Sequence, residues 1–455
     1  MVVPICRRQS DNARRRGKVL GKETRSGFRG ELRRACPVRN DRDVRPFARL
    51  RAKSRKPTGI GLRIAYFVHD LNDAAVARRL LMLKTAGFET VVAGFWRGAK
   101  PALEIAGART VPLGRTYDAR LAHRSFAAAF QALITRGVMR KVGPAHLFLA
   151  RNLEMLAIAV AAKRHFRVPP AVVYEVLDIH RSLLSSGLTG KALRLLERVL
   201  MDRSDFLLTS SPAFLYAYFE SPQFPDRRLP AAVIENKFLQ LQPRDQTDED
   251  AQLAPGPPWR IGWFGMIRCA RSLDILRDLA RRRPDLIQVE IRGRPAQSVF
   301  GNFEDRVRDV PSLSFGGPYA PADTQWLYGS VHFNWAIDYF EEGANSEWLL
   351  PNRIYEGGSC NAVPIALRRT ETGRWLKSLD LGVLLQDPAS DLETFLEKLT
   401  PADFETLKSA ARHAPRSVFI ADQSDCDRMA TILEKLVKRP QRVPLNDRAG
   451  HSARC

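Results

Sequence analysis

The 455-residue chain has few cysteines, and no two of them have the spacing of a metal site or a redox pair. Scattered thiols of this kind are typical of reduced cysteines in a cytoplasm. The longest apolar run extends from Met155 to Ala162 and is too short to cross a bilayer. Residues 1–56 lack the apolar segment of a signal peptide. We therefore expect a cytoplasmic protein without a membrane-spanning helix. The six cysteines are Cys6, Cys36, Cys269, Cys360, Cys426 and Cys455.

Several nucleotide-binding and catalytic motifs are also missing. We expect two domains, and in neither of them is the first strand followed by GxGxxG. The motifs GxxxxGK[ST], HExxH and GxSxG do not occur in the sequence. Of the DxD triplets, 41–43 lies in a basic tail and 425–427 on an expected surface helix, and we discount both as metal sites. These absences argue against a P-loop enzyme, a zincin and a serine hydrolase, and we predict no metal site.

The net charge of +23 is concentrated at the amino end of the chain. Residues 1–56 contain 19 Lys/Arg and 5 Asp/Glu, with few apolar residues, so we expect a disordered tail over residues 1–57. This segment is alternatively upstream sequence read through from a mis-assigned start. A non-enzymatic role, in which the tail binds nucleic acid or a membrane, is a further alternative. The tail has no interleaved aromatic and basic residues, so nucleic acid is not an expected partner.

From Leu62 onward the pattern is that of parallel α/β domains. Leu62–Val68 is an apolar run typical of a doubly buried strand, Ala74–Ala86 has helical spacing with Asp73 as its N-cap, and Glu89–Phe95 is a second strand. Strand, helix and strand in this order predict a right-handed parallel unit. The alternation continues to the end of the folded region, with further helices expected at residues 119–140, 273–283, 298–307 and 353–359.

We therefore predict an α/β protein with two Rossmann-like parallel-sheet domains that face each other across a cleft, where ligands of such folds bind. The first domain, which would bind the acceptor, is expected at residues 58–239, and a polar, proline-rich linker at 240–258. The second domain is expected at 259–421 and would bind the donor. A helix at 422–438 would pack back across the domains, and 439–455 would form a disordered tail.

The stretch from Glu347 to Ala366 combines a helix start with a carboxylate. A turn at Pro351–Asn352 is expected to open a short helix, Arg353–Ser359, with the proline just inside the helix start. An open helix amino end beside Asn352 and Arg353 suits a phosphate, and Glu356 one turn later can accept hydrogen bonds from a ribose diol. The alternative is a helix with a surface glutamate.

Other candidates follow strand ends in both domains. Gly265 would let a ligand approach the backbone, and Arg268 or Arg271 would neutralise a diphosphate, unless both are simply solvated. Asp178 and His180 are two residues apart after a strand of the first domain and would orient an acceptor hydroxyl or take its proton. Alternatively, Asp178 and His180 only cap a helix. His69 and Asp70, which follow the first strand, are further cleft candidates with the same two interpretations.

Four segments in this order resemble glycosyltransferase family 4 of the GT-B fold. They are IAYFVHDL, VIENK, GWFGMIRCARSLDIL and LPNRIYEGGSCNAVPIA, and the resemblance covers residues 62–438. The combination of YEVLDIH and GWFGMIR is most similar to bacterial exopolysaccharide sugar transferases of the succinoglycan type. The resemblance implies that Glu356 holds the ribose of a nucleotide sugar. It also implies that Arg271, and less closely Arg268, contacts the diphosphate.

The chain departs from the family pattern at three places. The position of the family's first glutamate, eight residues before Glu356, is occupied by Trp348, and Glu347 is one residue away from it. Met266 replaces the arginine that often follows the loop glycine. His69 and Asp70 replace a glycine pair after the first strand.

The resemblance implies a cytoplasmic glycosyltransferase that moves a hexose from a UDP- or GDP-linked sugar to a lipid-linked or soluble saccharide in exopolysaccharide biosynthesis. No metal and no cofactor other than the sugar nucleotide is expected. His180 or Asp178 would handle the acceptor proton, and Glu347 is a further cleft candidate. Basic residues of the first domain would hold the enzyme peripherally on an anionic membrane surface. The nearest alternative is a GT-B nucleotide-sugar 2-epimerase, which needs no acceptor.

Overall fold

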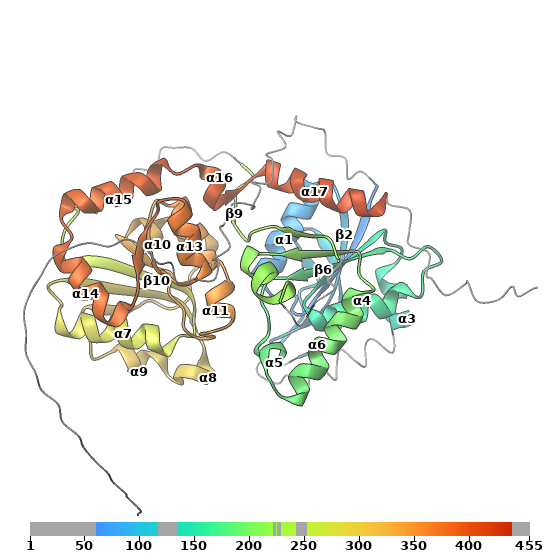
Figure 1. Ribbon diagram of the computed structural model, residues 1–455. Helices are drawn as coiled ribbons and strands as arrows, with labels where there is room; N and C mark the ends of the chain where they lie inside the picture. Colours follow the sequence, from blue (N-terminus) through green and yellow to red (C-terminus); the bar gives the residue numbers. More distant parts are fainter. Residues whose placement is uncertain (1–60, 117–134, 222–223, 225–228, 243–252, 439–455) are drawn as a thin grey trace, which may run out of the picture. The chain divides into compact units, whose positions relative to one another are not determined.

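The computed structural model describes residues 61–116, 135–221, 224, 229–242 and 253–438 (Figure 1). Four expected features fall outside these residues in whole or in part. They are the tails 1–57 and 439–455, most of the helix expected at 119–140, and the middle of the linker expected at 240–258.

In the described part of the chain, eight strands form the first sheet, and every neighbouring pair is parallel except β3 and β4. The central strands β1, β5 and β6 are buried on both faces, as their near-continuous apolar sequences predict. Across the sheet, the order is β3 (Glu104–Ile105), β4 (Ala108–Arg115), β2 (Glu89–Trp96), β1 (Arg63–Val68), β5 (Leu147–Arg151), β6 (Ala171–Val176), β7 (Phe206–Thr209) and β8 (Ala231–Val233).

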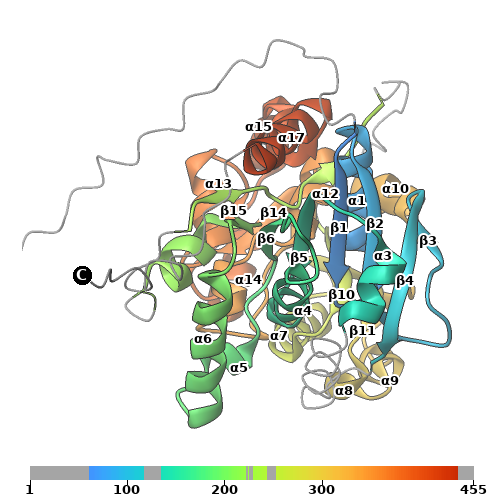
Figure 2. The same cartoon turned by 90° about the vertical axis from the view of Figure 1, so that its right-hand side faces the viewer.

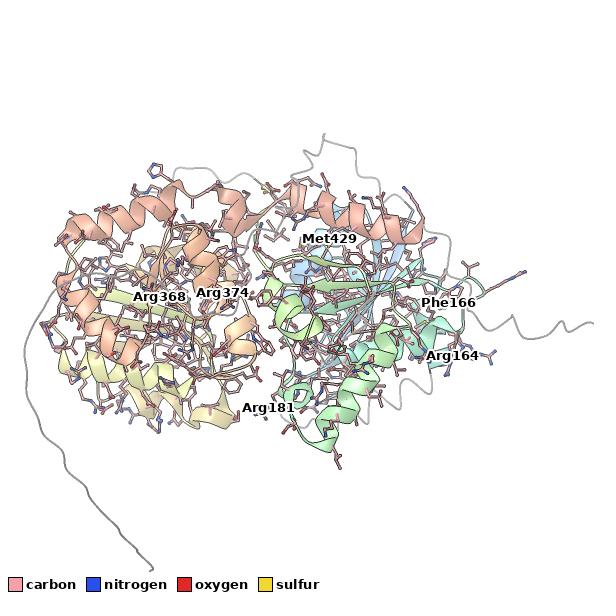
Figure 3. The ribbon with its side chains drawn as sticks, viewed as in Figure 1. Arg164, Phe166, Arg181, Arg368, Arg374 and Met429 are labelled. Atoms are coloured by element: carbon pink, nitrogen blue, oxygen red, sulfur yellow. The ribbon has the colours of Figure 1, made fainter. Side chains whose placement is uncertain are left out.

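Helices cover both faces of this sheet. One face packs against α3 (Thr135–Val142), α4 (Leu153–Lys163), α6 (Leu188–Met201) and a π-helical turn at Phe214–Phe219. The other face packs against α1 (Ala74–Thr85) and α17 (Gln423–Val437), so the last described helix of the chain completes the first core. Met429 of α17 lies over this face (Figure 3). The short helix α5 (Arg181–Leu184) directly precedes α6.

The second sheet has six strands in the order β12-β11-β10-β13-β14-β15, all parallel among the described residues. This is the strand order of a dinucleotide-binding fold, in which ligands bind beyond the carboxyl ends of the strands where the order reverses. The reversal lies between β10 and β13. The strands are β10 (Trp259–Ile267), β11 (Ile287–Pro295), β12 (Leu313–Phe315), β13 (Phe333–Trp335), β14 (Val363–Leu367) and β15 (Val383–Leu385).

Helices again alternate with these strands. They are α7 (Ala270–Arg282), α8 (Gln297–Phe300), α9 (Phe303–Val307), α10 (Thr324–Gly329), α11 (Asn345–Trp348), α12 (Asn352–Ser359), α13 (Glu371–Ser378), α14 (Pro388–Lys398), α15 (Pro401–His413) and α16 (Arg416–Phe419), with a 3-10 turn at Pro321–Asp323.

The chain passes between the two sheet regions twice, and the two crossings lie side by side. Strand β9 (Phe238–Leu239) leaves the first region and pairs in parallel with β16 (Ile420–Ala421), which leads back into α17. In Figure 1, α16 and β9 lie between α15 and α17, which overlap in the turned view of Figure 2. The linker region is therefore tied to the return crossing by backbone hydrogen bonds.

The expected α/β architecture with two parallel sheets is confirmed, and several local details differ. The helix expected at 298–307 is divided into α8 and α9 at Gly301, whose φ of 61° ends the first segment. Helix α7 begins three residues earlier than expected because the thiol of Cys269 accepts a hydrogen bond from the Ser272 N–H and acts as the N-cap. Pro351 is the N-cap residue of α12, not a residue inside it. The short elements β3, β9, β16, α5, α11, α13 and α16 were not predicted.

Candidate functional site

Helix α12 presents an open amino end and one carboxylate. Its N-cap, Pro351, has no side-chain acceptor, so the first-turn N–H groups receive no side-chain cap. Asn352, at the first helical position, accepts a hydrogen bond from the Asn236 amide at 2.7 Å, from the segment after β8. The helix follows β13, beside the reversal point of the second sheet, where its dipole favours an anion.

Glu356 lies between groups from both sheet regions. The Tyr328 hydroxyl donates to its Oε2 at 3.2 Å, and Arg78 Nη2 of α1 lies 3.9 Å from its Oε1. Arg78 in turn donates to the backbone carbonyl of Asn236 at 3.0 Å. The side chains of Glu356 and Arg78 are about four-fifths buried. Burial and the nearby carboxylate raise the pKa of Tyr328 well above its usual value, so the phenol remains a donor to Glu356. Glu356 is therefore an oriented carboxylate and not a solvated surface residue.

Arg353 places a cation at the end of β10. Its guanidinium donates to the backbone carbonyls of Trp335 and Met266, both at 3.4 Å. Gly265, the residue before Met266, has a φ of 105° and open space where a Cβ would stand. Gly293 of β11 lies against the Gly265 carbonyl so closely that a Cβ on it would overlap the oxygen. The structure thus holds a positive charge from α12 beside the exposed Met266, where the family pattern often has an arginine.

The two other arginines expected to contact a diphosphate are paired with acidic groups. Arg268 Nη2 lies 2.9 Å from Asp338 Oδ2, and its guanidinium stacks 5.1 Å from the centre of the Phe340 ring. Arg271 lies 3.1 Å from Glu342. Both carboxylates belong to the loop that follows β13. An anion bound here would compete with them, whereas the hydrogen-bond partners of Arg353 are the neutral carbonyls of Trp335 and Met266.

Glu347 lies on α11 and interacts with the charged loop after β13. It accepts a hydrogen bond from the Gly343 N–H at 3.3 Å and lies 3.4 Å from Arg369 Nε. Trp348, at the position of the family's first glutamate, packs against the core of the first sheet. Its carbonyl accepts a hydrogen bond from the Ser211 hydroxyl at 2.5 Å. The position therefore joins the two sheet regions and carries no carboxylate.

His69 and Asp70, the two candidates at the carboxyl end of β1, have different environments. His69 Nδ1 is buried without a hydrogen-bond partner, and its Nε2 lies 3.9 Å from Asp73. Burial lowers the pKa of His69, although the charges of Asp73, Glu154 and Asp178 oppose this effect. The imidazole is therefore neutral at pH 7. Asp70 is occupied structurally, because it accepts the Asn72 N–H and faces Arg97 at 3.6 Å.

Asp178 and His180 lie where the first region contacts the second. Between them, the Ile179 N–H donates to the Asn345 side chain of α11 at 3.2 Å. Asp178 is exposed. His180 is the N-cap of α5, and its Nδ1 accepts the Ser182 N–H at 3.2 Å. The capping interpretation of His180 is therefore correct for one ring nitrogen.

Sequence reasoning missed a buried charge cluster under this edge of the first sheet. Glu175 is fully buried and accepts hydrogen bonds from Arg79 at 2.7 Å, Arg151 at 2.9 Å and Tyr66 at 2.6 Å. Burial alone would raise the pKa of Glu175, but the two guanidinium charges outweigh it and lower the pKa to about 2. Arg151 also lies 3.5 Å from Asp73, so the cluster supports the loop that carries His69. The sequence does contain a sign of this cluster, because Arg151 and Glu175 are charged residues in the otherwise apolar strands β5 and β6.

Two features are absent from the residues that the structure describes. Within the described ranges, no helix is long and apolar enough to cross a membrane. No group of three or more metal-binding side chains occurs among the same residues.

The chain was compared with known proteins. No family model matches it. The succinoglycan biosynthesis protein ExoL of Rhizobium meliloti (strain 1021) is 39% identical over 397 residues, which cover 86% of this chain and 98% of ExoL.

Solved structures of more distant proteins share the fold. A sucrose-phosphate synthase from Thermosynechococcus elongatus superposes with a TM-score of 0.62 at 14% identity, covering 82% of this chain and 99% of the synthase. Anabaena HepE, solved in complex with UDP and glucose, gives 0.58 at 15% identity, covering 83% of this chain and all of HepE. The chain therefore belongs to the family of the succinoglycan biosynthesis protein ExoL and has the GT-B fold of the glycosyltransferases.

Proposed function

We propose that this glycosyltransferase moves a hexose from a UDP-linked sugar to a saccharide acceptor, lipid-linked or soluble, during exopolysaccharide biosynthesis. The name of the 39% identical relative supports the pathway, and HepE has been solved with UDP-glucose, which supports the donor. The observation that carries the proposal is the environment of Glu356. A buried, oriented carboxylate stands beside the open amino end of α12 at the reversal point of a dinucleotide-type sheet.

In this proposal, Glu356 accepts hydrogen bonds from the two ribose hydroxyls. The diphosphate lies between the amino end of α12 and the end of β10, where Gly265 leaves room and Arg353 supplies charge. Asn352 contributes its N–H at the helix start. Arg268 and Arg271 join the phosphates by exchanging their carboxylate partners for the more highly charged ligand.

The reaction breaks the bond between the anomeric carbon and the diphosphate oxygen and forms a bond from that carbon to an acceptor oxygen. Negative charge develops on the leaving diphosphate, and the fixed cations and helix dipole stabilise it without a metal. The acceptor hydroxyl loses its proton during the transfer. The candidates for receiving it are Asp178 and His180, which are both exposed after β6, and His69, whose imidazole is neutral. Asp178, within electrostatic reach of His69, and His180 remain candidates for orienting the acceptor.

In this proposal the enzyme works in the cytoplasm, where sugar nucleotides are available, and peripherally on the membrane that carries a lipid-linked acceptor. Basic residues of the first region would supply the electrostatic attraction to anionic lipids.

Titration calorimetry with UDP tests the donor site, with the variants Glu356→Gln and Arg353→Gln and with Glu405→Gln as a control. Glu405 is an exposed acid on α15, away from the end of β10. Hydrogen bonds to a charged group contribute about 1.5–3 kcal/mol each, so we expect at least tenfold weaker binding in each site variant. UDP affinity within twofold of the native value in both variants would refute the site.

A second measurement distinguishes transfer from epimerisation. Incubation of the enzyme with UDP-hexose alone should leave the sugar unchanged at C2, apart from slow hydrolysis. Accumulation of a 2-epimer without an acceptor would contradict the proposed transferase reaction and favour the epimerase.

A further inference from the structure

A cavity of about 340 Å³ lies where the first crossing of the chain meets the second sheet region. Its walls come from three segments, which are β9 with the residues that follow it, the 3-10 turn with the start of α10, and the last turn of α12. Helix α12 contacts both β9 and α10, so the three segments support one another (Figure 1). The volume is at the lower end of the range of small-molecule sites.

The lining of this cavity is electrically neutral. Among the residues that the structure describes, no Asp, Glu, Lys or Arg side chain lines it. Arg416 lies beside the cavity, where its Nη2 donates to the Gln240 side chain at 3.0 Å. An ionic ligand would lose hydration here without a counter-charge in the lining to replace it. The cavity therefore favours a neutral ligand.

Amide and hydroxyl groups supply the polar part of the lining. Glutamine side chains carry both donors and acceptors, as do the hydroxyls of Thr324 and Ser359. The Ser359 hydroxyl donates to the Glu356 carbonyl at 2.7 Å, so its oxygen can accept from a ligand. The half-buried Phe238 adds an aromatic wall. A ligand with many hydroxyl groups and apolar C–H faces, which is a saccharide, matches this lining. The three glutamines are Gln240, Gln242 and Gln325.

The cavity is separate from the donor end of α12. Ser359 and Cys360 are at the carboxyl end of this helix, whereas Asn352 begins it. The eight helical residues span about 12 Å. The Glu356 carboxylate faces Tyr328 and Arg78, and none of these three residues belongs to the described lining. A ligand in the cavity is therefore remote from the proposed diphosphate position.

We propose that this cavity is a second carbohydrate site, which binds a neutral saccharide without transferring it. The C–H face of a sugar ring packs on Phe238, and its hydroxyls exchange hydrogen bonds with Gln325 and Ser359. The inference rests on the lining of the cavity and not on the donor site. It stands if the calorimetric test of Glu356 fails.

Ligand-observed saturation-transfer NMR on the full-length protein tests the proposal, with the neutral disaccharide cellobiose as the probe. A titration to about 20 mM covers the millimolar affinities of small neutral ligands. Saturating UDP is present, so that binding at the donor position does not contribute. Ala322→Trp fills the cavity, and Gln325→Leu removes one amide at similar size. The matched control is Ala402→Trp, at an exposed position of α15 outside the described lining.

We expect saturable binding of cellobiose by the native protein and by the control. Ala322→Trp should weaken it at least tenfold, and Gln325→Leu about threefold or more, as expected for one neutral hydrogen bond. Glucuronate should bind several-fold more weakly than glucose, because the lining offers its carboxylate no counter-charge. If Ala322→Trp does not melt like the native protein, Gln325→Leu decides the result.

Three outcomes would overturn the proposal. The first is an absence of saturable binding by the native protein. The second is native affinity in both cavity variants, which would place the sugar in the acceptor part of the cleft instead. The third is glucuronate binding as tightly as glucose, which would show that the ligand class is wrong.

Cys360 provides a second, local measurement. Its thiol lines the cavity and is partly exposed, whereas Cys269 and Cys426 are buried. Peptide mass spectrometry after brief iodoacetamide treatment measures the alkylation rate at this position. Saturating cellobiose should slow alkylation of Cys360 at least threefold in the native protein and in Ala402→Trp, and should have no effect in Ala322→Trp. Equal rates with and without the sugar in the native protein would contradict the assignment.

Discussion

Replacing Glu197 by glutamine should stabilise the protein at neutral and alkaline pH. Glu197 is buried between Tyr174 and Tyr218, and no basic side chain hydrogen-bonds to it among the contacts of the described residues. Burial raises the pKa of its carboxyl from 4.5 to about 7, because the tyrosine hydrogen bonds and the charge of Arg194 only partly offset the loss of hydration. The folded protein therefore keeps a proton that the unfolded chain releases.

The sign and size of the effect follow from this difference. Below pH 4.5 the carboxyl is protonated in both states, and its contribution to stability is fully present. As the pH rises through 7, the unfolded state is favoured by 1.36 kcal/mol per pKa unit, which reaches about 3 kcal/mol above pH 7. Glutamine keeps a neutral, hydrogen-bonding group of the same shape and removes this loss.

Urea unfolding of the native protein and of Glu197→Gln at intervals from pH 4.5 to 8.5 measures the effect. The difference in unfolding free energy should grow by about 3 kcal/mol in favour of the variant across this range. Other titrating groups are common to both proteins and cancel in the difference. Glu405→Gln, at an exposed position, should show a constant difference. A constant difference for Glu197→Gln would mean that the carboxyl is ionised when folded, and the reasoning from burial would be wrong.

Two further predictions concern groups that support the candidate site. Glu175→Gln should cost about 3–5 kcal/mol in urea unfolding at pH 7, because Arg79 and Arg151 stay buried without their counter-ion. Because the pKa of Glu175 is about 2 in the folded protein, its contribution to the free energy of unfolding is present above pH 4.5 and is lost as the pH falls toward 2. If Glu175→Gln loses as much stability in acid as the native protein does, this assignment is wrong. Gly293→Ala should lower the melting temperature and weaken UDP binding together, because its Cβ would displace the Gly265 carbonyl. Unchanged UDP affinity would show that the glycine loop does not form the donor site.

Much of the architecture could be predicted from the order of apolar runs. Doubly buried strands such as β1 and β6 have almost entirely apolar sequences, and parallel strands joined by helices leave little choice of topology. The elements that were missed are short and depend on tertiary contacts. Strands β9 and β16 have two residues each and exist because two distant crossings of the chain pair with each other. Helix α13 contains Gly373, and its start depends on the Thr370 side chain.

The candidate site likewise has some features that follow from local sequence and others that depend on the fold. Local sequence is enough to place a carboxylate and a helix start together at Glu356 and Asn352, because both belong to one eight-residue helix. The partners of the charged residues come from the fold. Arg78 of α1 faces Glu356, and Asp338 and Glu342 pair with Arg268 and Arg271. The fold likewise makes His180 the cap of a helix and leaves one nitrogen of His69 unpaired. The physical reason is the distance along the chain over which each kind of interaction acts. Helix and strand periodicity is set by neighbours within a few residues, whereas charge pairing and burial depend on side chains that the fold brings together from far apart in the chain.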